Sequence, residues 1–446
     1  MKSALSPMKI RRSGKQVPAA MALLSLLLLT GCRAMPAFNV LRYEVARRTG
    51  VYDRTPTGGA TGTLAGRVMA DDGPVAHALV VAADPRGKAY TDRTDAAGYY
   101  RIDGLPPGWY TPAAAATGYA DGDPRNEAGY PVALHVTADA LTQGPPIRLE
   151  PVRVEALPQD AAAAVALTQT AAFSAATTFP PGSAAQVLSY RFVRDGVTVD
   201  SLRVYLPGHL APDARLPLLF FSYPGDVDGW QDVSVAFAAQ GYALVALSPA
   251  GERGLDVRAH AEDARIALAL ARQGALTPHI ATDEPIIVMG GSFTSAILYR
   301  LILMQPDCYS AWVTLGGIAD AFSGAEAFYA GKLELPPAYA YVIPAMGPPN
   351  LAARELLDYS PVAHAGELPP TLIIHTTADR ILPVAQAHAL AGALSDAGVP
   401  VETFYYEDVS HYLQIGADLT PAGEEMFYRI LDFVQRYQPT GNSDVQ

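Results

Sequence analysis

The chain has 446 residues, of which half are hydrophobic and 17% are charged, so we expect most of it to fold into two or three domains. Its net charge is −12 at pH 7, and loss of the five basic residues within 1–31 would leave −17. So acidic a body argues against nucleic acid or an anionic membrane surface as a ligand.

Residues 1–31 are typical of an export signal: a basic stretch is followed by the apolar run "AAMALLSLLLL", which is too short to span a bilayer. The run ends in "LTGC", which resembles the lipobox of bacterial lipoproteins. The resemblance implies that Cys32 is acylated and holds the mature protein on the extracytoplasmic side of a membrane, in the periplasm or at the cell surface. The alternative is a plain signal peptide in which Cys32 is accidental.

Residues 32–60 show no clear periodicity, and we interpret them as a tether. Residues 61–150 hold short β-type runs such as "TLAGRVMA" and "ALVVAA" between turn signals such as "DDGP" and "LPPG". This spacing predicts an all-β sandwich, with Greek-key connections.

The stretch "TDRTDAAGYYRIDGLPPGWY" resembles the carboxypeptidase regulatory-like β-sandwich family. The matching features are a Thr-Asp-x-x-Gly turn from Thr94 to Gly98, an aromatic-led strand, and Leu-Pro-Pro-Gly-x-Tyr. The resemblance implies a non-catalytic accessory domain that acts as a spacer or binds weakly.

Residues 151–185 are rich in Ala, Thr and Pro and are predicted to be a linker with one short helix. Over 186–438, near-continuous apolar strands alternate with amphipathic helices, which predicts a doubly wound α/β domain; residues 439–446 form a tail. The expected strands are "PLLFFSYP", "YALVALSP", "PIIVMGG", "YSAWVTLGG", "TLIIHTTAD" and "VETFYYED", after a hairpin in "SYRFVRDGVTVDSLRVYLP".

In "PIIVMGGSFTSAI", Ser292 lies where a strand gives way to a helix, with small residues before it. A serine at such a turn can be a helix N-cap or a nucleophile presented above the sheet. A nucleophilic serine needs a base and an acid that orients the base. Asp379 and His411 follow later strands in the order Ser, acid, His, so we expect a triad; Asp408 is a rival for the acid.

Together these features make residues 190–438 similar to the α/β-hydrolase superfamily, and especially to dienelactone-hydrolase-like and prolyl-oligopeptidase-like enzymes. The resemblance implies that Ser292 is the nucleophile, His411 the general base and Asp379 the orienting acid. The chain departs from the family pattern at two places. Thr294 stands where the last glycine of G-x-S-x-G is expected, and His375-Thr376 stand where His-Gly usually precedes the acid loop.

The resemblance also implies an oxyanion hole. One donor would be the backbone N–H of Phe293, and the other that of Gly225 or Asp226 in the loop after "PLLFFSYP". The sequence does not choose between the last two.

An insert over 318–369 separates two strands of the predicted sheet and is expected to form a lid. Its aromatic residues can line the substrate pocket or pack the lid onto the body. These aromatic residues are Phe328, Tyr329, Tyr339 and Tyr341.

The expected function is an exported, lipid-anchored serine hydrolase, a carboxylesterase acting on a small-molecule ester or acyl substrate without metal or cofactor. Membrane contact is expected only through the lipid anchor. The alternatives are a serine peptidase with the same triad, and a non-catalytic surface binding protein on a degenerate hydrolase scaffold.

Overall fold

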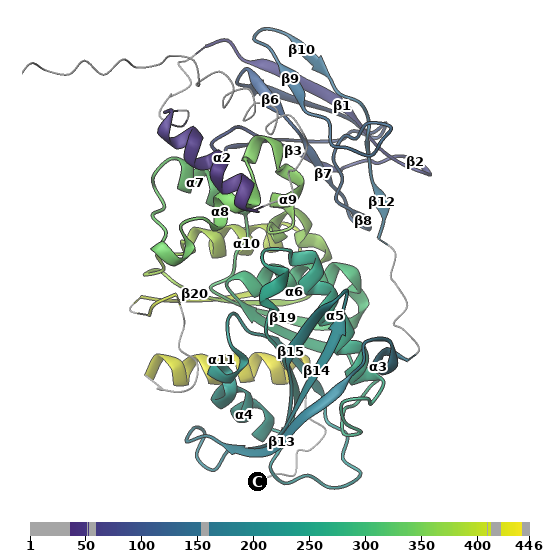
Figure 1. Ribbon diagram of the computed structural model, residues 1–446, viewed down its shortest axis with the longest axis vertical. Helices are drawn as coiled ribbons and strands as arrows, with labels where there is room; N and C mark the ends of the chain where they lie inside the picture. The colour runs from purple at the N-terminus through teal and green to yellow at the C-terminus, as the bar shows by residue number, and fades with distance from the viewer. Residues whose placement is uncertain are drawn as a thin grey trace, which may run out of the picture.

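The computed structural model describes residues 36–50, 52, 59–152, 160–407, 409–411 and 421–438. The predicted signal peptide, Cys32 and the tail 439–446 lie outside the described residues. A β-rich domain occupies one end of the molecule and the α/β domain the other, with the insert between them (Figure 1). In the described ranges, no helix is both long and apolar enough to cross a bilayer.

The β-rich domain is built around β1 (Gly62–Ala70), whose residues alternate between buried and half-buried. β1 pairs with β5 (Tyr99–Leu105), β10 (Leu141–Gln143), β11 (Ile147–Arg148) and β2 (Gly73–Pro74). A second sheet has the order β4 (Ala89–Arg93), β3 (Leu79–Ala83), β7 (Ala113–Ala115), and the two sheets share one apolar core. The remaining strands are β6 (Gly108–Tyr110), β8 (Tyr119–Ala120), β9 (Leu134–Val136) and β12 (Glu150–Pro151).

The Thr-Asp-x-x-Gly motif is a tight turn held by side chains. Thr94 is buried, and its hydroxyl accepts from the Ala78 N–H at 2.8 Å and donates to the Val75 carbonyl at 2.7 Å. Asp95 Oδ1 accepts from two N–H groups within the turn. Gly98 has φ +77°, and a Cβ there would lie 2.5 Å from the Val68 carbonyl oxygen, so the position requires glycine.

The α/β domain is built on a nine-stranded sheet of order β13-β14-β15-β17-β16-β18-β19-β20-β21. The first three strands are antiparallel, and from β17 onward every neighbour is parallel. The parallel strands lie where the apolar runs predict them: β16 (Leu218–Ser222), β17 (Ala243–Leu247), β18 (Ile286–Gly291), β19 (Tyr309–Leu315), β20 (Thr371–Thr376) and β21 (Val401–Tyr406).

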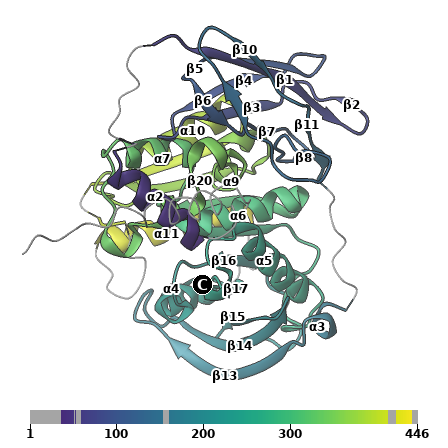
Figure 2. The ribbon, with the colours of Figure 1, turned by 45° about the horizontal axis from the view of Figure 1, so that its top comes forward.

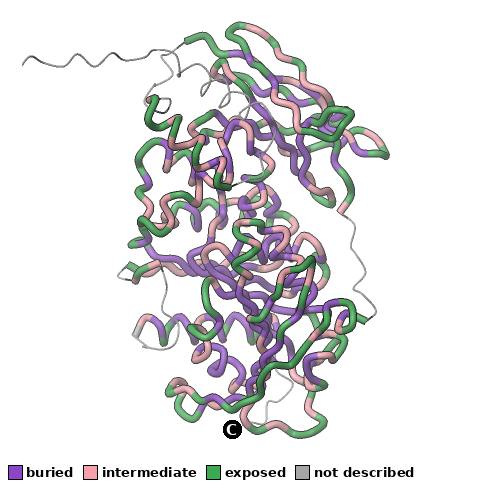
Figure 3. The backbone as a smooth tube through the Cα atoms, viewed as in Figure 1, coloured by how far each residue is buried: buried purple, intermediate pink, exposed green. Residues whose placement is uncertain are grey.

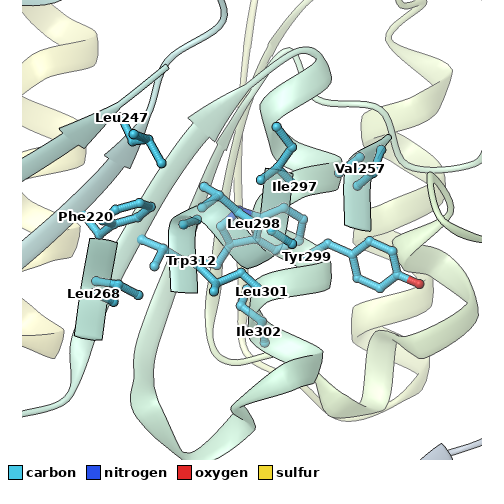
Figure 4. Close-up of a cluster of buried hydrophobic side chains, with 14 of the residues drawn as sticks. Phe220, Leu247, Val257, Leu268, Ile297, Leu298, Tyr299, Leu301, Ile302 and Trp312 are labelled. Atoms are coloured by element: carbon cyan, nitrogen blue, oxygen red, sulfur yellow. The ribbon is translucent and has the colours of Figure 1, made fainter. Parts of the chain in front are cut away.

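Helices cover both faces of this sheet. α4 (Gln231–Ala239) and α11 (Pro421–Tyr437) share a core with one face, and α5 (Val257–Arg272), α6 (Phe293–Met304) and α10 (Ala385–Asp396) share a core with the other. Figure 4 shows the second core, in which apolar side chains of α6 meet Phe220 of β16 and Trp312 of β19. Short 3-10 turns η1 (Val227–Trp230), η2 (Gly251–Arg253) and η3 (Pro306–Cys308) complete the connections.

The predicted linker 151–185 contributes an element to the sheet. After the short helix α3 (Ala161–Ala164), β13 (Thr168–Ala176) pairs along its length with β14 (Ala184–Arg194), which leads into β15 (Val197–Pro207). Nearly every residue of β13 is exposed, since it is an edge strand. Its small polar sequence therefore lacks the apolar alternation by which a strand is predicted.

The predicted tether is also partly ordered. α2 (Pro36–Arg48) lies against α8 (Val342–Met346) of the insert (Figure 1). Its helical form is stabilised by contacts with a distant segment, which a local pattern does not reveal.

The insert consists of short helical turns between β19 and β20. They are α7 (Ala321–Tyr329), η4 (Pro337–Tyr339), α8, η5 (Pro349–Leu351), α9 (Ala353–Leu357) and η6 (Pro361–Glu367). Figure 2 shows α7 and α9 between the β-rich domain and the parallel sheet.

The β-rich domain is packed onto the insert. Val81, Ala83, Ala113 and Ala115, on β3 and β7, belong to the same apolar cluster as the core of the α/β domain. Asn350 stabilises the contact with two hydrogen bonds. Its side-chain amide donates to the Trp109 carbonyl at 2.7 Å, and its backbone carbonyl accepts from the Thr111 N–H at 2.8 Å. Buried residues therefore lie on both sides of the contact between the two domains (Figure 3).

A buried ion cluster crosses the same interface. Asp121 of the β-rich domain pairs with Arg300 of α6 and accepts from His364 Nε2 at 2.8 Å. His364 Nδ1 lies 2.5 Å from Glu367 Oε1. Burial by itself would lower the pKa of His364, but the hydrogen bonds with Asp121 and Glu367 outweigh it and raise the pKa to about 9. His364 is therefore a buried cation at neutral pH.

Candidate active site

Ser292 is the residue between β18 and α6, and its backbone has φ 50° and ψ −126°. Positive φ is uncommon for a residue with a Cβ and is held only where the surroundings enforce it. The Ser292 N–H donates to the Leu315 carbonyl of β19 at 3.0 Å. A Cβ at Gly291 would lie 2.6 Å from the same carbonyl oxygen, so the strained turn depends on glycine there.

Thr294 stands where the family pattern has glycine, and it is fully buried. Its Oγ1 lies 2.6 Å from the Ser222 carbonyl at the end of β16 and accepts from the Gly291 N–H at 3.0 Å. The hydroxyl thus ties the turn to the neighbouring strand. The β-branched side chain is accommodated because its polar atom has partners on both sides.

The structure brings the three predicted triad side chains together. His411 Nε2 lies 3.0 Å from Ser292 Oγ, and His411 Nδ1 lies 2.6 Å from Asp379 Oδ2. Ser292 and Asp379 are 87 residues apart, yet both lie at the carboxyl ends of parallel strands. The arrangement has the order serine, imidazole, carboxylate that nucleophilic catalysis requires.

Asp379 is oriented by the backbone. Its Oδ1 accepts from the N–H groups of Ile381 and Leu382, both at 2.8 Å, which leaves Oδ2 for His411. Burial works to raise the pKa of Asp379, but the hydrogen bond and charge of His411 and the two N–H donors outweigh it, so its pKa lies below the usual value. The carboxylate is therefore ionised at neutral pH and can stabilise an imidazolium.

Thr376 and His375, at the end of β20, lie next to the acid and the histidine. Thr376 stands where the family pattern has glycine. Its hydroxyl accepts from the Ala378 N–H at 3.1 Å and donates to the carbonyl of Val409 at 2.6 Å; Val409 lies two residues before His411. His375 is fully buried, as a core histidine is expected to be, and burial lowers its pKa. Its Nε2 lies 4.0 Å from Asp379 Oδ2. Asp408, the rival acid, lies outside the described residues.

The oxyanion-hole candidates lie on two segments. Phe293 is the first residue of α6, where an N–H has no partner within the helix, and it borders the same cavity as Ser292. Gly225 and Asp226 lie on the exposed loop between β16 and η1. This loop is beside the serine turn, since Ser222 pairs with Gly290, but neither residue borders the cavity.

An apolar cavity of about 260 Å³ opens at Ser292. Its walls come mainly from the insert, on α7, α8 and the segment before it, and from the loop after β20. The residues that line it include Leu255, Ile318, Ala325, Leu335, Tyr339, Val342, Ile343, Met346, Tyr359, Ile381 and Leu382.

The aromatic residues of the insert divide between the two roles open to them. Tyr339 borders the cavity. Phe328 and Tyr329 pack against Tyr43 of α2, with ring centroids 5.8 and 5.9 Å from it. Tyr341 is exposed, and its hydroxyl donates to Glu44 of α2 at 3.4 Å.

Gln386 borders the cavity and was not expected from the sequence. Its Oε1 accepts from the N–H groups of Ala319 and Asp320, and its Nε2 donates to the Asp320 carbonyl and to Ser323 Oγ. The amide therefore has its partners within the protein and holds the start of the insert to α10. A single glutamine inside a helix carries no motif by which it could be predicted.

No group of three His, Cys, Asp or Glu side chains is placed to hold a metal ion among the residues that the structure describes.

Comparison with known families identifies both domains. Residues 63–139 match the carboxypeptidase regulatory-like domain, and residues 267–439 match the prolyl oligopeptidase family. The chain is a β-rich carboxypeptidase regulatory-like domain followed by a serine hydrolase of the α/β-hydrolase type. The predicted fold class, apart from the lid, and the predicted class of enzyme, a serine hydrolase, are thereby confirmed.

Similar solved structures include several of Thermogutta terrifontis esterase 2. The sarin-phosphonylated form is 19% identical with a TM-score of 0.43, and the match covers 56% of this chain and 94% of the esterase. The apo form is 20% identical with a TM-score of 0.42 and the same coverage. The butyrate-bound form is 19% identical with a TM-score of 0.41, covering 56% of this chain and 93% of the esterase. No curated protein matches this chain.

Proposed function

We propose that the α/β domain is a carboxylesterase that forms an acyl-enzyme on Ser292, with His411 as general base and Asp379 as the orienting acid. The observation that carries this proposal is the hydrogen-bonded chain from Ser292 Oγ through His411 to Asp379, which stands at the opening of an apolar cavity.

The reaction follows from the positions of these atoms. Ser292 Oγ attacks the ester carbonyl carbon while its proton passes to His411 Nε2, and the carbonyl oxygen becomes an oxyanion. The N–H of Phe293, with that of Gly225 or Asp226, would stabilise the oxyanion; one such donor is typically worth about 2.7–4 kcal/mol. The intermediate collapses, and His411 gives the proton to the departing alcohol.

Water completes the cycle. It attacks the acyl carbonyl as His411 accepts one of its protons, and the bond to Ser292 Oγ breaks as that proton returns to the serine. The carboxylic acid leaves and the enzyme is regenerated.

The cavity supports an ester over a peptide as substrate. A peptide chain would bury several N–H and C=O groups, and each needs a hydrogen-bond partner. Among the described residues that line the cavity most side chains are aliphatic, and the amide among them, Gln386, is already bonded on both atoms. An apolar acyl chain needs no such partners.

The test compares Ser292→Ala with the parent protein in labelling by a fluorophosphonate probe and in hydrolysis of p-nitrophenyl butyrate. We expect both to be lost in Ser292→Ala and both to persist in Ser174→Ala, which changes an exposed serine on β13. A parent protein that never labels would support the non-catalytic binding protein. Faster hydrolysis of aminoacyl anilides than of esters would support the peptidase.

We also propose that the protein is exported and acylated at Cys32. The support is the "LTGC" sequence after a basic stretch and a short apolar run. Incorporation of radiolabelled palmitate that is lost in Cys32→Ser tests this proposal. A parent protein that takes up no label would contradict it.

A further inference from the structure

One face of α2 holds the wall of the cavity. Asn39 is buried, and its side chain donates to the Ala345 carbonyl of α8 at 3.0 Å. The Tyr43 ring packs on Phe328 and Tyr329 of α7. Residues of both helices also line the cavity, so α2 packs on the two helices that form this part of its wall (Figure 1).

The opposite face of α2 carries apolar side chains that are exposed among the residues the structure describes. Ala37, Leu41 and Val45 follow one another at four-residue spacing and so lie on one side of the helix. Leu41 is 51% exposed and Val45 is 39% exposed. Tyr341, 48% exposed, lies beside them because its hydroxyl bonds Glu44. We call Leu41, Val45 and Tyr341 the α2 patch.

The charge around the α2 patch differs from that of the whole chain. α2 carries three arginines, Arg42, Arg47 and Arg48, against one acid, Glu44. The chain as a whole has a net charge of −12, so general adsorption to an anionic surface is disfavoured. An apolar stripe with arginines around it is suited to the boundary of a lipid bilayer at this one place.

The length of chain before α2 limits where the patch can be. Pro36, the first residue of α2, comes four residues after Cys32. Four Cα–Cα steps of about 3.8 Å span at most about 15 Å. An acylated Cys32 would therefore hold the start of α2 within about 15 Å of the bilayer surface.

We propose that the α2 patch docks on the bilayer that holds the lipid anchor, and that the cavity wall of α7 and α8 faces this bilayer through α2. The substrates are then esters that partition into the membrane. This inference rests on the acylation of Cys32 within the proposed function and goes beyond it, because an anchor alone fixes no face of the protein toward the membrane.

The first test locates the patch. The acylated full-length chain carries Cys308→Ser and one fluorescent label, at Leu41→Cys or, as a matched control, at Phe173→Cys, which is exposed on the far edge strand β13. The proteins are reconstituted in vesicles of phosphatidylethanolamine and phosphatidylglycerol at about 3:1. We expect doxyl-labelled lipids to quench the label at position 41 several-fold more than the label at 173.

Equal quenching at both positions overturns the proposal. A label at 41 that is shielded from aqueous iodide yet unquenched by doxyl lipid also overturns it, and shows that a second copy or another protein covers the patch. Protein that does not float with the vesicles overturns both the anchor and the docking. Quenching is read without any substrate, so failure of the esterase proposal is scored separately.

The second test asks whether docking serves the reaction. We compare Leu41→Glu/Val45→Glu with Phe173→Glu/Val193→Glu, since all four side chains are exposed. In the first variant we expect hydrolysis of a long-chain ester embedded in vesicles to fall on the order of ten-fold, and hydrolysis of soluble p-nitrophenyl acetate to be unchanged. An equal effect of both variants on the embedded ester overturns the proposal.

Discussion

At Thr294 the family pattern has a glycine, which allows helix and strand to pack closely. In this chain the threonine hydroxyl instead forms a hydrogen bond with the neighbouring strand. Glycine there would let the helix approach the strand, whereas the Thr294 hydroxyl ties the serine turn to Ser222 of β16. The strained φ of Ser292 is thus held from both sides, by Thr294 and by the Leu315 carbonyl.

Thr294→Val tests this role of the hydroxyl. Valine has nearly the same shape, so its chief effect is to leave buried polar groups without a partner, and we expect the free energy of unfolding to fall by about 1–3 kcal/mol. We expect fluorophosphonate labelling of Ser292 to slow on the order of ten-fold, which corresponds to about 1.4 kcal/mol. Thr294→Ser keeps the hydroxyl and should label near the parent rate; equal rates for all three proteins would contradict the proposed role.

Asp379→Asn tests the role of the acid. The asparagine carbonyl can still accept from Ile381 and Leu382, but its amide would then donate to His411 Nδ1 and force the proton onto Nε2. That tautomer cannot accept the serine proton, so we expect kcat to fall about 10³–10⁴-fold with the fold unchanged by circular dichroism. Because the triad acts as a unit, Ser292→Ala/Asp379→Asn should be no less active than Ser292→Ala.

That Ser292, Asp379 and His411 lie together could be predicted from sequence, because the chemistry of a triad imposes an order on its members and places them after particular strands. The partners of Thr294 and Thr376 could not, since each hydroxyl bonds a carbonyl on another segment, 72 and 33 residues away. Such a bond depends on the register of two strands, which no local pattern records.

At the scale of elements, α7 forms one wall of the cavity, and Gly324 is the residue of α7 in that wall that has no side chain. A Cβ at Gly324 would meet only Gln386 Nε2, at 3.9 Å, so the position has room for a larger residue. Gly324→Leu should therefore fold and fill part of the cavity.

We expect Gly324→Leu to lower kcat/KM for p-nitrophenyl octanoate on the order of ten-fold or more relative to the acetate ester. Gly324→Ala is the control and should shift this ratio much less. If octanoate and acetate were affected equally by Gly324→Leu, the acyl chain would not occupy the cavity beside α7.

The elements that were predicted well are those with buried apolar faces. β16 to β20 are near-continuous apolar runs because helices cover both faces of the sheet. β13 and α2 were missed because both are largely exposed, and each is stabilised by pairing or packing with a segment distant in sequence. The lid role of the insert stays a prediction, since its position over the cavity does not show that it moves.

At the scale of the whole molecule, the ion cluster at the domain interface makes stability depend on pH. The pKa of His364 is about 9 when folded, above the value near 6.5 of an unfolded histidine. Its stabilising contribution is therefore complete below pH 6.5 and is lost as pH rises through about 9. This difference between the folded and unfolded pKa corresponds to roughly 3 kcal/mol of stability. Solvent screens the interaction little, because the His364 side chain is only 1% exposed.

Urea unfolding at pH 6 and pH 9 measures this contribution. We expect the parent to lose more unfolding free energy between the two than His364→Gln, by roughly 3 kcal/mol. The charged groups that face His364 are Asp121, Glu367 and Arg300. His209→Gln changes an exposed histidine and should behave like the parent; equal pH dependence in His364→Gln would contradict the prediction.

The sheet of β3 and β7 is buried on both faces, one in the core of its own domain and one against the insert. The consequence concerns cooperativity. Neither domain can unfold without exposing the apolar surface of the other, so heating should give a single calorimetric transition. A fragment starting at the hydrolase sheet would leave that surface bare and self-associate. We therefore expect the regulatory-like domain and the hydrolase domain to unfold as one unit.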